Sequence, residues 1–198
     1  MKFALATEDE LSEAIGKKLL DEAGIKPEYG VHLLRRQGNG YLRSRMKNWK
    51  QMAQHFHLLI LTDLDQHNCP LALVENWLGE DFRCPDGMLL RIAVRQIESW
   101  ALADHEAMRK LIGRRGRLPR APDDLPDSKL SLLRLAASAP KAVREELLAK
   151  EGAVARQGLG YNRRMVSWVT EVWNPARAAS RSESLARARE AIRKLQFS

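Results

Sequence analysis

The apolar run at residues 57–62, His-Leu-Leu-Ile-Leu-Thr, constrains the fold more than any other stretch of the sequence. It has the length of a β-strand, and its Leu and Ile residues follow one another without the alternation of a half-exposed strand. Such a strand is buried on both faces, which is typical of a parallel sheet covered by helices. The run stops at Asp63-Leu64-Asp65, so we expect two carboxylates at the carboxyl end of a buried strand.

Three further apolar runs, each followed by a helical pattern, indicate three more strands at residues 2–7, 29–34 and 88–94. Parallel neighbours need a long crossover, usually a helix. The alternation therefore predicts an α/β fold with a parallel-rich central sheet flanked by helices. We expect one continuous helix at residues 41–56, between the second and third of the four strands, and another from Glu98 to Ile112, after the last strand.

The second half of the chain has a different pattern. Residues 113–126 carry arginines among Gly and Pro, and helical patterns follow at residues 128–137, 141–151, 163–173 and 185–195. We therefore divide the chain into an α/β core, residues 1–113, and a basic, mainly helical C-terminal extension, residues 114–198, packed on that core. Ser182 is placed to cap the last helix.

Positive charge is concentrated in this second half. Residues 1–100 carry 13 Lys and Arg against 14 Asp and Glu, net −1, and residues 101–198 carry 20 against 11, net +9, which gives the overall +8. A basic half joined to a half with an acidic site suits a metal-dependent enzyme that acts on nucleic acid. A solvated, arginine-rich helical surface would give the same distribution, so charge alone does not decide between the two.

Carboxylates follow three of the predicted strands. Glu8 comes after the first strand, Asp63 and Asp65 after the third, and Glu98 where the fourth strand meets its helix. The carboxyl ends of parallel strands share one edge of a sheet, where open α/β sheets bind their ligands. Like charges converge there when a cation offsets them, and carboxylate oxygens suit Mg²⁺ or Mn²⁺. For Glu8 and Glu98 the alternative is an ordinary place at a helix N-terminus, where the helix dipole favours negative charge.

A basic loop offers candidates for phosphate contact. Arg35 and Arg36 precede Gly38 and Gly40. Such a loop either approaches a phosphate closely or forms a plain turn with solvated arginines. It is not a P-loop, because no Gly-Lys-Ser/Thr occurs. Arg181 is a third candidate.

Other features bear on location and redox state. No apolar run reaches the roughly 18–20 residues of a membrane span, and the first one is too short for a signal peptide. We therefore expect a cytoplasmic protein without membrane contact. Cys69 and Cys84 lack the paired spacing of a metal site and indicate reduced thiols.

Four stretches resemble the TOPRIM domain, which is shared by topoisomerases, primases and nucleases of the OLD (overcoming lysogenization defect) type. They are Ala6-Thr7-Glu8-Asp9-Glu10, Leu61-Thr62-Asp63-Leu64-Asp65, Arg95–Asp104 and Ser180–Leu185. A glutamate after the first strand and Asp-x-Asp after a later one is the pattern of that domain. The chain also resembles a compact group of bacterial TOPRIM-like proteins often associated with genome defence. It departs from the pattern at Glu8-Asp9, where the family has Glu-Gly. Either Glu8 or Glu10 is then the first carboxylate, and we take Glu8.

The resemblance implies metal-dependent hydrolysis of phosphodiesters in DNA or RNA. The catalytic and metal-ligating residues it points to are Glu8, Asp63, Asp65 and Glu98, with Glu8 alternatively a general base. Small defence nucleases of this type commonly work with an ATPase, and this chain has no Walker motif, so an ATPase partner is expected. Strand passage is not expected, because no second domain carries a nucleophilic tyrosine.

Two alternatives stay open. One is a non-catalytic TOPRIM-like module that binds nucleic acid or a partner ATPase. The other is a small-molecule phosphatase, since Asp-x-Asp after a strand also marks enzymes similar to haloacid dehalogenases. Those typically continue to Thr or Val at the position where this chain has His67. The strandedness of the substrate and the oligomeric state, a homo-oligomer included, also stay open.

Overall fold

The computed structural model describes residues 2–25, 31–35, 38–79 and 83–195, and of residues 31–35 only the backbone. Four parallel strands form one sheet in the order β2-β1-β3-β4. They are β1 (Phe3–Thr7), β2 (Val31–Arg35), β3 (His57–Asp63) and β4 (Met88–Ala93). The predicted α/β class with a parallel sheet is confirmed, and every strand begins and ends within two residues of its predicted bounds.

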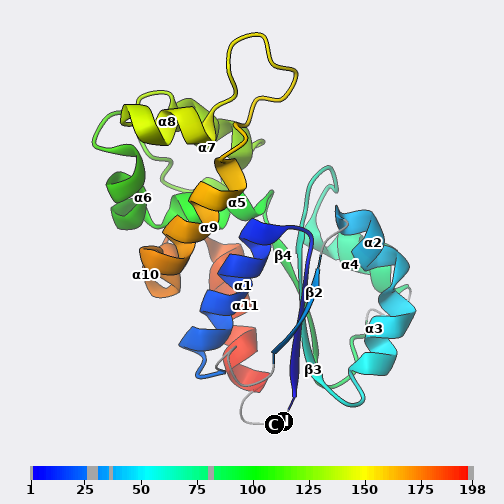
Figure 1. Ribbon diagram of the computed structural model, residues 1–198. Helices are drawn as coiled ribbons and strands as arrows, with labels where there is room; N and C mark the ends of the chain where they lie inside the picture. The colour runs from blue at the N-terminus through cyan, green and yellow to red at the C-terminus, as the bar shows by residue number, and fades with distance from the viewer. Residues whose placement is uncertain (1, 26–30, 36–37, 80–82, 196–198) are drawn as a thin grey trace.

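Helices cover both faces of the sheet (Figure 1). One face carries α2 (Gly38–Ser44), α3 (Met46–Met52) and α4 (Pro70–Leu78). The other carries α1 (Glu10–Glu22), α5 (Ile97–Ala103), α9 (Tyr161–Glu171) and α11 (Glu183–Leu195). The remaining elements pack on this second layer and are α6 (His105–Ile112), the 3-10 helix η2 (Pro122–Asp124), α7 (Ser128–Ala136), α8 (Lys141–Leu147) and α10 (Pro175–Ala179).

β3 is buried on both faces, as its sequence predicts. Leu58 and Ile60 belong to the core cluster under α2–α4, whereas Leu59 and Leu61 belong to the cluster under α1 and α5. None of the four side chains is more than 1% exposed. Successive side chains of a strand point to opposite faces, so this one run of residues requires a helical layer on each side.

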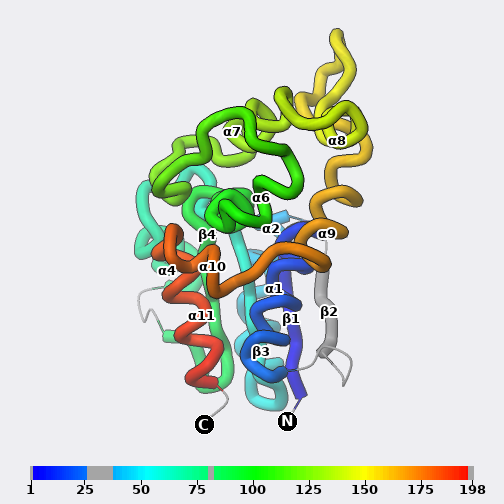
Figure 2. The backbone as a smooth tube through the Cα atoms, turned by 90° about the vertical axis from the view of Figure 1, so that its left-hand side faces the viewer, coloured from blue at the N-terminus to red at the C-terminus, as the bar shows by residue number. Residues whose placement is uncertain are grey.

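The C-terminal helices share one core with the α/β part. Trp168 of α9 and Trp173 after it lie in the same cluster as Leu59 and Trp100. The indole N–H of Trp173 donates to the carbonyl oxygen of Trp100 at 3.0 Å, which satisfies a buried polar group across the predicted boundary at residues 113 and 114. Figure 2 shows α6, α7 and α8 together at the end of the molecule towards which the strands run. None of the helices in the described ranges combines the length and the apolar character that crossing a membrane requires.

Two predicted helices are interrupted, so this part of the prediction is wrong. The helix expected at residues 41–56 is α2 followed by α3, and α2 already begins at Gly38, inside the predicted loop. The helix expected from Glu98 to Ile112 is α5 followed by α6, with Asp104 between them at φ −83° and ψ 84°. Ser182 does cap α11, because its Oγ accepts the N–H of Leu185 at 3.2 Å.

The side chain of Asp104 accounts for the second interruption. It is 0% exposed, and its carboxylate accepts the N–H of Ala107 at 3.2 Å, which caps α6. The same carboxylate accepts Nε and Nη2 of Arg177 at 2.9 and 2.7 Å and the N–H of Asn174 at 2.8 Å. The hydrogen bond to Asp104 is the main cause that raises the pKa of Arg177. Asp104 therefore joins the end of α5, the start of α6 and α10.

Replacing Asp104 by Ala is expected to lower the free energy of unfolding by about 3–5 kcal/mol, because it removes the carboxylate partner of Arg177 and leaves two backbone N–H groups without their acceptor. Urea unfolding followed by circular dichroism measures this change. Glu106→Ala is the matched control, because Glu106 is an exposed acid that also lies near Arg177, at 3.6 Å. The control should differ from the parent by less than about 0.5 kcal/mol. Equal losses in the two variants would contradict the role assigned to Asp104.

Candidate active site

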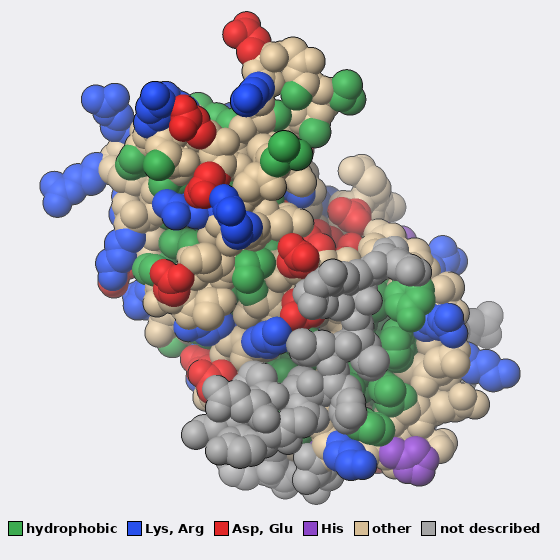
Figure 3. Space-filling model, viewed as in Figure 1, with side chains coloured by type: hydrophobic (Ala, Val, Ile, Leu, Met, Phe, Trp, Pro, Cys, Tyr) green, Lys and Arg blue, Asp and Glu red, His purple; other side chains and the backbone are tan. Residues whose placement is uncertain are grey.

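The carboxylates predicted from the strand ends lie at the carboxyl edge of the sheet. Asp63 is the last residue of β3, Glu8 follows β1, and Glu98 lies in the first turn of α5 after β4. The negative charges of Glu8, Glu98 and Asp65 all act on Asp63. Figure 3 shows acidic side chains in the hollow between the helical end of the molecule and the side that carries α2 to α4. The fold thus places the four carboxylates that the sequence singles out at one edge of the sheet, near enough for the other three to act electrostatically on Asp63.

Glu8 connects β1 to β3. Its Oε1 accepts the N–H of Asp63 at 2.9 Å and the hydroxyl of Thr62. Burial raises the pKa of Glu8, and the charges of Asp65 and Asp9 add to this, although the two hydrogen bonds act in the opposite direction. Glu10, the alternative first carboxylate, instead lines a cleft between α1 and α9. Glu8 is therefore the glutamate whose carboxylate contacts β3.

Asp63 lies at the centre of the cluster. Its Oδ1 accepts the N–H of Ile97, the first residue of α5, at 2.8 Å. Burial raises the pKa of Asp63 well above its usual range, and the charges of Glu8, Glu98 and Asp65 raise it further. Ionising Asp63 in this position therefore costs free energy, and either protonation or a nearby cation removes this cost.

Asp65 lies on a tightly held turn. Its φ of 48° is in the left-handed region, which Asp tolerates better than most residues. The backbone N–H of Asp65 donates to the carbonyl oxygen of Arg95 at 3.0 Å, and Nη1 of Arg95 donates to the carbonyl oxygens of Asp65 and His67 at 3.2 and 2.7 Å. Asn39 of α2 donates to Oδ2 of Asp65 at 2.9 Å. Arg95 and Asn39 are supporting residues that the sequence did not mark as functional.

Glu98 receives its partners from the C-terminal helices. The hydroxyl of Tyr161 donates to Oε1 of Glu98 at 2.9 Å, and Nζ of Lys129 lies 3.6 Å from the same oxygen. Burial raises the pKa of Glu98, whereas Lys129 and Tyr161 oppose this rise. Burial and the charge of Glu98 raise the pKa of Tyr161 well above its usual range. No sequence signal connects these residues, because the partners of Glu98 lie 31 and 63 positions further along the chain.

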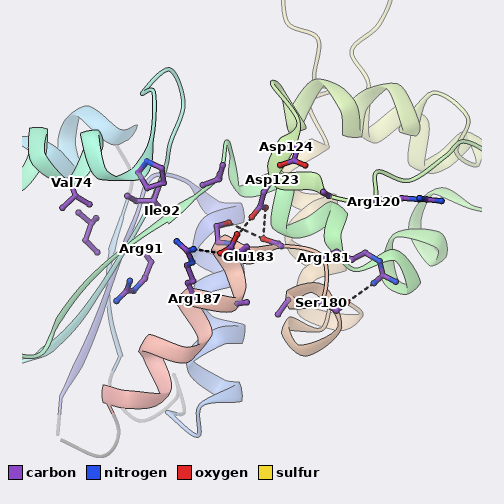
Figure 4. A pocket seen from close by; sticks show the side chains of 18 residues that line it. Val74, Arg91, Ile92, Arg120, Asp123, Asp124, Ser180, Arg181, Glu183 and Arg187 are labelled. Atoms are coloured by element: carbon purple, nitrogen blue, oxygen red, sulfur yellow. Dashed lines mark hydrogen bonds and ion pairs between the residues drawn. The ribbon is translucent and has the colours of Figure 1, made fainter.

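The three arginines predicted to bind phosphate lie in different parts of the chain, and the structure describes them to different extents. The backbone of Arg35 pairs with Thr7 at the same edge of the sheet, but its side chain and all of Arg36 lie outside the described residues. Arg181 is exposed, and its Nη1 donates to the hydroxyl of Ser180 at 3.2 Å. It lines a cleft of about 920 Å³ between β4 and α4 on one side and α10 and α11 on the other (Figure 4). None of the four carboxylates lines that cleft.

The chemistry of the cluster suits a hard cation, although its present geometry does not form a closed site. Every candidate ligand is a carboxylate oxygen, the donor type that Mg²⁺ and Mn²⁺ prefer. Within the described ranges, no three His, Cys, Asp or Glu side chains are arranged around a common metal position. Glu8 and Glu98 instead accept hydrogen bonds from Thr62 and Tyr161.

Comparison with known proteins does not identify a family. No family model matches the chain. No curated protein and no solved structure matches it either. The function is therefore argued from the site itself.

Asp63→Asn is expected to raise the melting temperature at pH 7–8 in EDTA. The pKa of Asp63 is higher in the folded than in the unfolded chain. Its stabilising contribution is therefore present below the ordinary aspartate pKa and is lost as pH rises through the folded-state pKa. The amide oxygen of Asn still accepts the Ile97 N–H but carries no charge. A gain of about 1 kcal/mol would appear as a rise of roughly 2–4 °C.

Differential scanning calorimetry between pH 4 and pH 8 measures this gain. Glu151→Gln removes an exposed carboxylate from a loop and serves as the control, with no change expected in the pH dependence of melting. A lower melting temperature for Asp63→Asn than for the parent at pH 8 would show that the ionised carboxylate does not destabilise the fold.

Proposed function

We propose that this chain is a Mg²⁺-dependent nuclease with a TOPRIM-like site formed by Glu8, Asp63, Asp65 and Glu98. The observation that carries the proposal is that Glu8, Asp65 and Glu98 follow the ends of neighbouring strands, near enough to the buried Asp63 for their charges to raise its pKa beyond the rise that burial causes. A fold gains no stability from gathering like charges, so such a cluster marks a candidate functional site. From the sequence resemblance alone, we further propose a role in defence against foreign genomes.

Within this proposal, Asp63 and Asp65 hold the metal, and Glu98 or Glu8 completes the ligand set. A bound Mg²⁺ or Mn²⁺ would lower the pKa of a coordinated water and stabilise charge on the attacking and leaving oxygens. The raised pKa of Glu8 also makes its carboxylate a stronger base than that of an ordinary glutamate, which suits it to accept a proton. Its hydrogen bonds from Thr62 and from the backbone of Asp63 keep its carboxylate directed towards β3.

The charge distribution supports a polyanionic substrate. The half of the chain beyond residue 100 carries the whole net positive charge. Its arginines at positions 114, 115, 117 and 120 are exposed and follow directly on α6. Exposed Lys and Arg side chains also occupy the helical end of the molecule in Figure 3, on the upper side of the acidic hollow. Exposed basic groups on the same molecule as an acidic site would bind phosphates of a nucleic acid that extends beyond the bond to be cut.

Asp63→Ala is expected to abolish EDTA-sensitive cleavage, because it removes the central carboxylate of the cluster. Supercoiled plasmid and labelled single- and double-stranded DNA and RNA oligonucleotides are incubated with Mg²⁺ or Mn²⁺, with and without EDTA. Glu151→Ala is the matched control and should cut like the parent. Circular dichroism verifies that each variant is folded. Equal cleavage by Asp63→Ala and the parent would refute the site assignment.

One observation favours a second candidate, a non-catalytic module that binds nucleic acid or a partner ATPase. Glu8 and Glu98 already have hydrogen-bond partners within the protein, and the described residues hold no ready-made set of three metal ligands. Isothermal titration calorimetry with Mg²⁺ and Mn²⁺ separates the two candidates. Binding that Asp63→Ala abolishes supports the nuclease, and the absence of any binding by the parent supports the module.

A further inference from the structure

The backbone around Tyr161 is held firmly in place. It is the first residue of α9, is 1% exposed, and its N–H donates to the carbonyl oxygen of Gly158 at 3.1 Å. Gly158 is itself pressed against the end of α8, where an added Cβ would lie 2.4 Å from the carbonyl oxygen of Glu146. The start of α9 is thus packed closely against α8, and this packing holds the backbone from which the phenol of Tyr161 extends to Glu98.

Lys129 approaches the same carboxylate from α7. Its backbone N–H donates to Oε1 of Gln96 at 3.0 Å, which ties the start of α7 to the residue that precedes α5. Its Nζ lies 3.6 Å from Oε1 of Glu98 and 5.1 Å from the centre of the Tyr161 ring. Ammonium, phenol and carboxylate therefore form one compact group, and two of its three members belong to the part of the chain beyond residue 113.

Both donors contact the same oxygen of Glu98. The Tyr161 hydroxyl donates to Oε1, and the ammonium of Lys129 lies 3.6 Å from the same oxygen, so both partners act on one end of the carboxylate. Two partners that approach one oxygen from different helices restrict the rotamers that the Glu98 side chain can adopt. Partners that orient a ligand in this manner typically change metal affinity by about 10–100-fold when they are removed.

We propose that Tyr161 and Lys129 are positioning residues, which hold Glu98 by Oε1 in the orientation that the metal site requires. This inference rests on the proposed function, because it assigns Glu98 to that site. It also gives the C-terminal helices a second task. Besides carrying positive charge, α7 and α9 complete the active site, so residues 1–113 alone lack the groups that orient Glu98.

The test compares two substitutions that each remove a single tyrosine hydroxyl. Tyr161→Phe removes the donor to Glu98. Tyr41→Phe, the matched control, changes a half-buried tyrosine in the other core cluster, edge-on to Trp49. Affinity for Mn²⁺ is measured by calorimetry with the full chain, and kcat and KM are measured on the nucleic acid that the parent cuts best.

Tyr161→Phe is expected to weaken Mn²⁺ binding by roughly 10–100-fold and to lower kcat, with KM for the nucleic acid unchanged. Tyr41→Phe should match the parent in all three quantities. A merely structural role of the hydroxyl would alter the urea midpoint and leave the Mn²⁺ affinity of the folded protein unchanged. If Tyr161→Phe does not fold, the half-buried Lys129 provides a second pair of variants, in which Lys129→Arg should keep more Mn²⁺ affinity than Lys129→Met.

The possible failures are distinguishable. If the parent binds Mn²⁺ and the folded Tyr161→Phe and Lys129→Met variants bind it equally well, the positioning role is overturned and the nuclease proposal stands. If the parent binds neither Mn²⁺ nor Mg²⁺, the proposed function fails, and the positioning role fails with it.

Discussion

The burial of β3 on both of its faces is the constraint on which the rest of the structure depends. Leu58 and Ile60 require cover from α2–α4, and Leu59 and Leu61 require cover from the layer that contains α1 and α5. Parallel neighbours on both sides of β3 are joined by helical crossovers, so all four strands end at the same edge. The residues that follow β1, β3 and β4 are neighbours for that reason.

At this edge the ionised carboxylates that the proposed function requires lower the stability of the fold. The pKa values of Glu8, Asp63 and Glu98 are all raised, in each case chiefly by burial. Keeping such groups ionised at neutral pH costs free energy that the hydrophobic core must offset. The hydrogen bonds from Thr62 and Tyr161 reduce this cost by stabilising the charged forms of two of these acids. These two hydrogen bonds do not reach Asp63, so the cost of ionising Asp63 remains.

The short helix α5 joins the candidate site to the body of the molecule. Its first residue donates its N–H to Asp63, and its second residue is Glu98. Trp100 in its middle accepts the indole N–H of Trp173, and Asp104 at its end binds Arg177. Long-range contacts to Tyr161 of α9, to Trp173 between α9 and α10, and to Arg177 of α10 thus hold this seven-residue helix in place. The C-terminal helices are therefore part of the structure around the site as well as a basic surface.

Local sequence determined the strands, most of the helices and the carboxylates of the candidate site. Apolar runs such as residues 57–62 define buried strands without reference to distant residues, and the acids that follow them need only the parallel sheet to meet. The interruption at Asp104 depends on Arg177, which is 73 positions away, and the orientation of Glu98 depends on Tyr161, which is 63 positions away. Hydropathy periodicity reports only on neighbours within a turn or a strand. The partners of Asp104 and Glu98 were therefore decided by the tertiary structure alone, because only the packing of the C-terminal helices on α5 brings these side chains into contact.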